Sequence, residues 1–216
     1  MKFILKSLIF LTLMAFAISC SSDSAPVEGS TPCVPITCLN GGVSTPNCGC
    51  TCPQGFTGNN CSTQITPSKI KITKITVKKF PNFDGTNTWD PCSTLCLTAD
   101  DINRKRPDIY FTIENTNLVE IYKHPSYFPN VISNLIGTDL FEFTPTVSLE
   151  FTNFSTGYIL NLKDYDGAES NFISPDDEMG FVAFMLYNSN GGFPTTKTIT
   201  NSNGTLIFEL TLQYTW

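Results

Sequence analysis

Residues 70–79 read IKITKITVKK, and this stretch decides the fold class. Apolar side chains at Ile70 and Ile72 alternate with Lys and Thr, which is the period of a strand that buries one face. The alternation resumes one position late, at Ile75 and Val77. A β-bulge inserts a single extra residue in this way, so we predict a long strand with one bulge.

Seven similar runs follow along the chain. They are short, rich in β-branched and aromatic residues, and separated by Gly, Pro, Asn and Asp, which favour turns. No segment shows the period of a helix. We therefore predict an all-β protein with an eight-stranded antiparallel sandwich. The predicted strands are 70–77, 109–114, 119–122, 146–151, 158–163, 180–187, 195–200 and 205–214.

The composition argues against two classes of protein. There are 13 Lys and Arg against 19 Asp and Glu, a formal net charge of -6. Phosphate binding needs clustered basic residues, so we expect no nucleic-acid partner. The 17 Phe and 7 Tyr supply apolar surface that disordered chains lack, so we expect a folded chain.

Residues 1–19 predict export. Lys2 and Lys6 precede an apolar run from Leu8 to Ile18, the order of charge and hydrophobicity found in a secretory signal peptide. The run is too short to cross a bilayer. Export leads to an oxidising compartment in which disulfides persist.

The end of this segment, Ala17-Ile18-Ser19-Cys20, is followed by a serine-rich switch and resembles the lipobox of bacterial lipoproteins. The resemblance implies cleavage before Cys20 and a lipid anchor on Cys20 that binds the membrane. Ser21 agrees with sorting to the outer membrane in that family, so the resemblance implies an exported outer membrane lipoprotein. An ordinary signal peptide with an incidental cysteine is the alternative. Residues 20–32 are small and polar and are interpreted as a flexible tether.

Six cysteines lie within residues 33–61, with the spacing C-x4-C-x9-C-x-C-x-C-x8-C. Such density in a short exported segment indicates a disulfide scaffold, because so few residues cannot bury a core of their own. A zinc cluster is the alternative, and no histidine lies nearby to favour it. The spacing by itself leaves the pairing open.

The sequences CLNGG at 38–42 and CTCPQGFTGNNC at 50–61 closely resemble an EGF-like domain. The resemblance implies the disulfides Cys33–Cys48, Cys38–Cys50 and Cys52–Cys61. Residues 33–61 contain no Asp, Glu, Lys, Arg or His, so we expect no calcium in this module. We interpret it as a spacer or a protein-contact surface.

Two loop sequences in the predicted sandwich, residues 66–216, resemble fixed points of a C2 domain, a family of eight-stranded sandwiches. They are RPDIYF at 106–111 and KDYD at 163–166, the latter followed by DEMG at 177–180. Matched residue by residue, the resemblance implies that calcium is bound here by the loop aspartates Asp84, Asp108, Asp164, Asp166 and Asp177.

Elementary electrostatics supports the same site. Five carboxylates at one end of a sandwich repel one another, and Ca²⁺, which takes six to eight oxygen ligands, relieves that repulsion. The alternative is that these aspartates are turn residues whose side chains bond their own backbone. An EF-hand does not fit, because the third acidic position after Asp164 and Asp166 is wrong.

The remaining cysteines, Cys92 and Cys96, lie in an enlarged loop between Asp84 and Asp108, and we predict a disulfide between them. His124 stands alone, without a nucleophile signature nearby. Since no catalytic motif is present, we do not expect an enzyme.

Together these features predict a cell-surface protein, similar to lipoproteins of the Bacteroidetes group, in which an EGF-like spacer presents a C2-like sandwich to an extracellular protein or glycan. A rival hypothesis is an accessory carbohydrate-binding or glycan-processing protein. Exposed aromatics such as Trp89, Tyr127 and Phe128 would favour it, because sugar faces stack on aromatic rings. A structural envelope protein without a ligand is the third hypothesis.

Overall fold

The computed structural model describes residues 33–90, 106–133, 140–167 and 176–216. Within these ranges all regular structure is β-strand, which confirms the all-β class. The described ranges therefore hold no helix of the length and apolarity that crossing a bilayer requires. The predicted signal peptide, the anchor Cys20, the tether and the pair Cys92–Cys96 lie outside the described residues. Residues Pro35–Trp216 form one compact unit.

The cysteine-rich segment, residues 33–64, consists of two small antiparallel hairpins. β1 (Val43–Ser44) pairs with β2 (Cys50–Thr51), and β3 (Phe56–Thr57) pairs with β4 (Thr63–Gln64). Disulfides join Cys38 to Cys50 and Cys52 to Cys61, two of the pairs that the EGF-like pattern implies. Cys33 and Cys48 are also disulfide-bonded.

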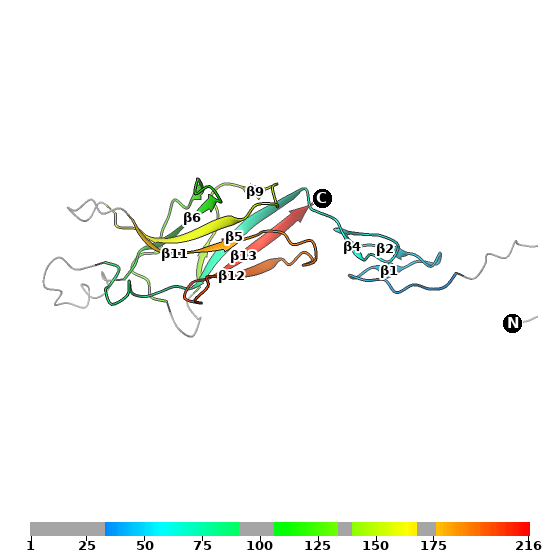
Figure 1. Cartoon of the computed structure of the whole chain (residues 1–216), viewed down its shortest axis with the longest axis horizontal. Coiled ribbons are helices and arrows are strands. Elements are labelled where there is room, and N and C mark those ends of the chain that lie inside the picture. Colours follow the sequence, from blue (N-terminus) through cyan, green and yellow to red (C-terminus); the bar gives the residue numbers. More distant parts are fainter. Residues whose placement is uncertain (1–32, 91–105, 134–139, 168–175) are drawn as a thin grey trace, which may run out of the picture. The chain divides into compact units, whose positions relative to one another are not determined.

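Two antiparallel sheets follow and lie against each other as two layers (Figure 1). The first has the order β11-β10-β6-β7, and the second has the order β12-β13-β5-β8, with β9 also pairing with β5. The strands are β5 (Lys69–Lys79), β6 (Ile109–Asn115), β7 (Glu120–Lys123), β8 (Phe141–Phe143), β9 (Leu149–Phe151), β10 (Tyr158–Asp164), β11 (Asp177–Phe184), β12 (Thr196–Thr200) and β13 (Ile207–Thr215).

The central strand β5 has the predicted bulge and a second register shift near its end, where Ile207 pairs with Lys79 and Phe208 with Val77. Ile70, Ile72, Ile75 and Val77 are fully buried in the core between the sheets. Opposite them, the register of β13 shifts between Thr211, which pairs with Lys74, and Leu212, which pairs with Ile72. One residue of β5 is therefore extra, which keeps both halves of the isoleucine pattern facing inward.

One edge of the second sheet differs from the prediction. The strand predicted at 146–151 covers only Leu149–Phe151, and Phe141–Phe143 forms a strand that the sequence pattern did not indicate. Both pair with β5, one after the other along its length. Pro145 lies between them and has no amide hydrogen for a ladder bond, which explains why the edge is divided.

The strand register of the first sheet gathers acidic residues at one end. Asp164, the last residue of β10, pairs with Ile109 of β6 on one side and with Asp177 of β11 on the other. Asp108 directly precedes Ile109. Three aspartates that are distant in sequence therefore lie at the same end of three adjacent strands.

Candidate metal centre

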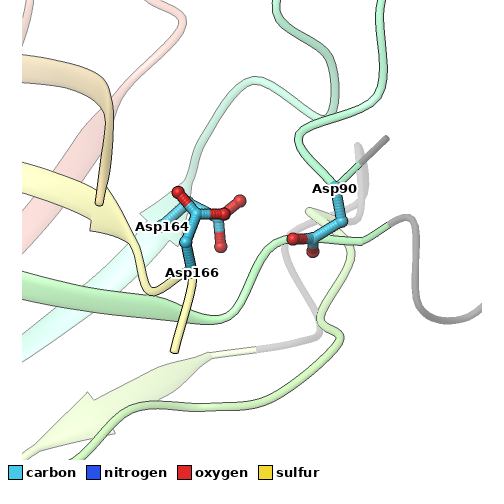
Figure 2. A group of neighbouring side chains, drawn as sticks. All are labelled: Asp90, Asp164 and Asp166. Carbon is cyan, nitrogen blue, oxygen red and sulfur yellow. The ribbon is translucent and has the colours of Figure 1, made fainter. Parts of the chain in front are cut away.

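Three carboxylates converge at this end of the sandwich. Asp90, Asp164 and Asp166 each offer one oxygen atom, and these atoms all lie within 4.8 Å of one another. Figure 2 shows the carboxylates of Asp164 and Asp166 side by side, with that of Asp90 facing them. The group thus combines the end of β10 with the loop that follows β5.

The two aspartates from the end of β10 keep unused acceptor atoms. The side chain of Asp164 is fully buried, and its Oδ1 accepts a hydrogen bond from the backbone N–H of Asp108 at 2.6 Å. Within the described part of the chain, the buried atoms Asp164 Oδ2 and Asp166 Oδ2 have no hydrogen-bond donor. Buried carboxylate oxygens are normally paired, so these two atoms call for a positive ligand. A divalent cation fits this donor set.

The pKa values of the three carboxyl groups are raised by burial and by the charges of neighbouring carboxylates. Burial, followed by the charges of Asp164 and Asp108, raises the pKa of Asp90 to about 8. Burial raises the pKa of Asp164 to about 7, against the opposing effect of the Asp108 N–H. Burial and then the charge of Asp177 raise the pKa of Asp166 to about 6. The group therefore holds protons more tightly than isolated aspartates do, and a cation would replace them.

Asp108 and Asp177 lie close enough to act on the group electrostatically. Both contribute to the raised pKa values of Asp90, Asp164 and Asp166. Asp108 also joins the neighbouring loops, because its carbonyl oxygen accepts from the N–H of Tyr165 at 2.9 Å and its Oδ1 accepts from the N–H of Asn130 at 2.6 Å.

Asp84 is placed differently from the sequence-based prediction. It is exposed, its backbone pairs with that of Asn87, and it is not one of the three grouped carboxylates. Asp90 takes part in its place. The residue before it, Trp89, is only 6% exposed and donates its indole N–H to the carbonyl of Pro81 at 2.8 Å, which fixes the loop and directs Asp90 towards β10.

A second set of contacts holds the loop that contains Asp166. Asp176 accepts hydrogen bonds from the hydroxyl of Tyr110, from Lys123 and from the N–H of Asp166. Burial would raise the pKa of Asp176, but the bonds from Tyr110 and Lys123 outweigh it and lower the pKa. Asp176 is therefore a charged anchor for the loop.

The aromatic platform considered for the carbohydrate hypothesis is not formed by the predicted residues. Trp89 is buried and Phe128 packs partly against the core, so Tyr127 is the exposed member of the three. Its ring stacks on Tyr165 with the centroids 4.7 Å apart. The carboxylates of Asp90, Asp164 and Asp166 are therefore the main candidate binding site among the described residues at this end of the sandwich.

The free energy of unfolding of the ion-free protein should fall as the pH rises from about 4 to about 8. The folded-state pKa of Asp164 lies above the ordinary value of 3.8, so the stabilisation from its protonated form is complete below about pH 4 and is lost as the pH rises through about 7. Urea unfolding in EGTA, repeated across this pH range, measures the effect. The variant Asp164→Asn/Asp166→Asn should show a flatter profile and Asp84→Asn the parental one, and equal profiles for all three proteins would contradict the assignment.

Comparisons with known proteins do not assign a family. No protein-family model matches the chain, and no curated protein matches it. Among solved structures, human GIVD cytosolic phospholipase A2, in complex with a fluorophosphonate inhibitor and terbium chloride, is similar with a TM-score of 0.39 and 13% identity, over 69% of this chain and 18% of that one. A C2 domain of plant extended synaptotagmin 1 is similar with a TM-score of 0.34 and 11% identity, over 70% of this chain and 97% of that domain. The chain thus spans less than a fifth of the phospholipase.

Proposed function

We propose that the sandwich is a calcium-binding module whose site is built on Asp90, Asp164 and Asp166. The observation that carries this proposal is the pair of buried oxygens, Asp164 Oδ2 and Asp166 Oδ2, that have no donor within the described residues. The group offers carboxylate oxygens and no nitrogen or sulfur, which suits a hard cation such as Ca²⁺.

The surrounding residues would link this site to the loop surface. The N–H of Asp108 orients the carboxylate of Asp164, and the side chain of Asp108 in turn holds the backbone of Asn130. Bound calcium would supply positive charge that neutralises the carboxylates. The segments around Asp108, Asn130 and Asp166 would then be held in one arrangement, as a binding surface requires.

We propose that binding rather than catalysis is the role of the protein. His124 is 7% exposed, and its ring nitrogens lie 2.8 Å from the carbonyl oxygen of Ser126 and 3.2 Å from that of Thr144. Its hydrogen-bonding capacity is thus used within the fold, which supports a structural role for this side chain.

The proposal places the module at the cell surface. The N-terminal sequence supports export and a lipid anchor on Cys20, and the paired cysteines support an EGF-like spacer before the sandwich. The side chain of Gln64 donates to the carbonyl of Asn188 at 2.9 Å and accepts from the N–H of Gly192 at 2.8 Å. These bonds join the end of the cysteine-rich segment to the segment between β11 and β12 of the sandwich, which supports a spacer attached to it. The sandwich would present its calcium site to an extracellular protein or glycan.

Calcium affinity, measured by titration calorimetry, tests the site residue by residue. Asp90→Asn is expected to weaken calcium binding about tenfold or more, because it removes a charged ligand. The matched control is Asp84→Asn, which removes the same charge from the same loop at an exposed position outside the group. It should leave the affinity nearly unchanged.

The two variants also distinguish a ligand set that contains Asp90 from one that contains Asp84. If Asp84→Asn abolishes binding and Asp90→Asn does not, the ligand set implied by the C2 resemblance is correct and the one proposed here is wrong. If the parent protein takes up no calcium at millimolar concentration, the aspartates are turn residues.

A further inference from the structure

A second candidate site lies far from the carboxylates. It is a pocket of about 460 Å³, lined by residues that include Lys71 on β5, Gln213 and Thr215 on β13, and the rings of Phe193 and Trp216. It lies where β5 begins, whereas the loop with Asp90 follows the other end of that strand. The eleven residues of β5 separate the two regions by roughly 30 Å.

The pocket contains Lys71, a lysine that forms no ion pair among the described residues. Along β5, three lysines form ion pairs with glutamates of neighbouring strands: Lys69 with Glu150, Lys74 with Glu142, and Lys78 with Glu209. Lys71 lies directly opposite Glu150 in the register of β5 and β9, but the carboxylate of Glu150 is 2.7 Å from Lys69 instead. Among the described residues, Lys71 therefore has no ion pair.

Glu150 interacts most strongly with Lys69 and Ser148, and the charge of Lys71 acts on it more weakly. Hydrogen bonds from Lys69 and Ser148 lower the pKa of its carboxyl group, so it stays ionised and paired. The charged side chains that line the pocket are two ammonium groups and one carboxylate. Lys71 is the one of them that forms no ion pair among the described residues, so it can pair with an anionic ligand.

One wall of the pocket is aromatic. The rings of Phe193 and Trp216 are 5.0 Å apart and nearly perpendicular, at 85°. The indole Nε1 of Trp216 is buried without an acceptor within the described structure, while the hydroxyl of the adjacent Tyr214 donates to Pro194. Aromatic rings bind the apolar faces of sugars.

The floor of the pocket is formed by β5 and the end of β13. At the pocket β5 is paired on both sides, with β13 and β9, whereas β13 pairs with β12 only as far as Thr211 and beyond that residue has β5 as its ladder partner. The exposed side chains of Gln213 and Thr215 provide donors and acceptors. Side-chain polar groups beside an aromatic wall suit the hydroxyl groups of a ring.

We propose that this pocket binds an acidic sugar, one that carries a carboxylate on a pyranose ring. The carboxylate pairs with Lys71, the apolar face of the ring lies against Trp216 and Phe193, and the hydroxyl groups contact Gln213 and Thr215. The volume falls within the roughly 300–1,000 Å³ range of small-ligand sites. This site is separate from the proposed calcium site and does not depend on it.

The test uses the full chain with three acidic probes, galacturonate, glucuronate and N-acetylneuraminate, each beside its carboxyl-reduced counterpart. Nuclear magnetic resonance follows the indole N–H signals of the two tryptophans of the chain. At least one acidic probe should shift the Trp216 signal and leave that of Trp89, which is bonded to Pro81, in place. The reduced counterpart and the variant Lys71→Gln should each weaken binding about tenfold, the loss expected for one charge-assisted hydrogen bond.

Lys78→Gln is the matched control, because it removes a lysine from the same strand outside the pocket. All measurements are made in EGTA, so that failure of the calcium site cannot affect the result. The proposal is overturned if none of the probes moves the Trp216 signal at millimolar concentration, or if Lys71→Gln binds as the parent does. Binding of anionic lipid vesicles without binding of the acidic sugars would also overturn it.

Discussion

Calcium at a thousandfold excess over its dissociation constant should raise the free energy of unfolding of the full chain by about 4 kcal/mol. The ion binds the folded loops, where Asp90, Asp164 and Asp166 are already close together, and the unfolded chain offers no such group. Urea unfolding at pH 7.5, with EGTA and then with millimolar Ca²⁺, measures this increase. Magnesium, which demands a smaller octahedral site, should produce less of it.

The variant Asp164→Asn/Asp166→Asn should reverse the order of stability. In EGTA it should be more stable than the parent, because two carboxylates that repel their neighbours become neutral amides. In Ca²⁺ it should be less stable, because the ion has lost two ligands. A damaged fold would make the variant less stable than the parent in both EGTA and Ca²⁺. A variant that is more stable in EGTA and less stable in Ca²⁺ therefore indicates a calcium site and not a structural role. A parent that does not respond to calcium would refute the site.

The sandwich itself was largely predictable from local patterns. The isoleucines of β5 repeat every second residue with one break, and the structure places a bulge at that break. The segments Ile109–Asn115 and Tyr158–Asp164 were predicted nearly to the residue, because buried alternating strands have a strong sequence signal. The divided edge was missed because strands of three residues are too short to show a period.

The part of the candidate site that lies at the ends of regular strands was predictable from the sequence. Asp108 and Asp164 lie beside regular strands, so their meeting at one end of the sheet follows from the antiparallel register. Asp84 and Asp90 both lie in the long segment after β5, where no periodicity indicates direction. The choice of Asp90 depends on the burial of Trp89, a tertiary contact that spacing does not reveal.

The pocket around Lys71 could not be predicted from motifs. Its residues come from β5, β9, β13 and the segment between β11 and β12, and Phe193 and Trp216 are distant in sequence from the lysine. The distinctive feature is that Glu150 pairs with Lys69 rather than with its direct cross-strand neighbour Lys71. Such a choice of partner is decided by side-chain geometry, which the sequence does not contain.

Replacing Phe111 with alanine should lower the free energy of unfolding by about 3–5 kcal/mol, the range for removing a large buried ring. Phe111 lies on β6, is fully buried, and touches rings from both layers of the sandwich: Tyr122 of the first sheet at 5.6 Å and Phe143 of the second at 5.3 Å between centroids. Its loss would leave a cavity where the sheets meet. Urea unfolding in EGTA, followed by tryptophan fluorescence, measures the change.

Phe83→Ala is the control for this substitution, because Phe83 is 58% exposed and its removal should change stability by no more than about 0.5 kcal/mol. Small domains have only about 5–15 kcal/mol of total stability, so Phe111→Ala could already be partly unfolded in water. Phe111→Leu then provides the measurement, since it keeps an apolar side chain and should lose clearly less than the alanine variant. If all three variants unfold at the parental urea concentration, Phe111 does not join the two sheets, and the packing described here would be wrong.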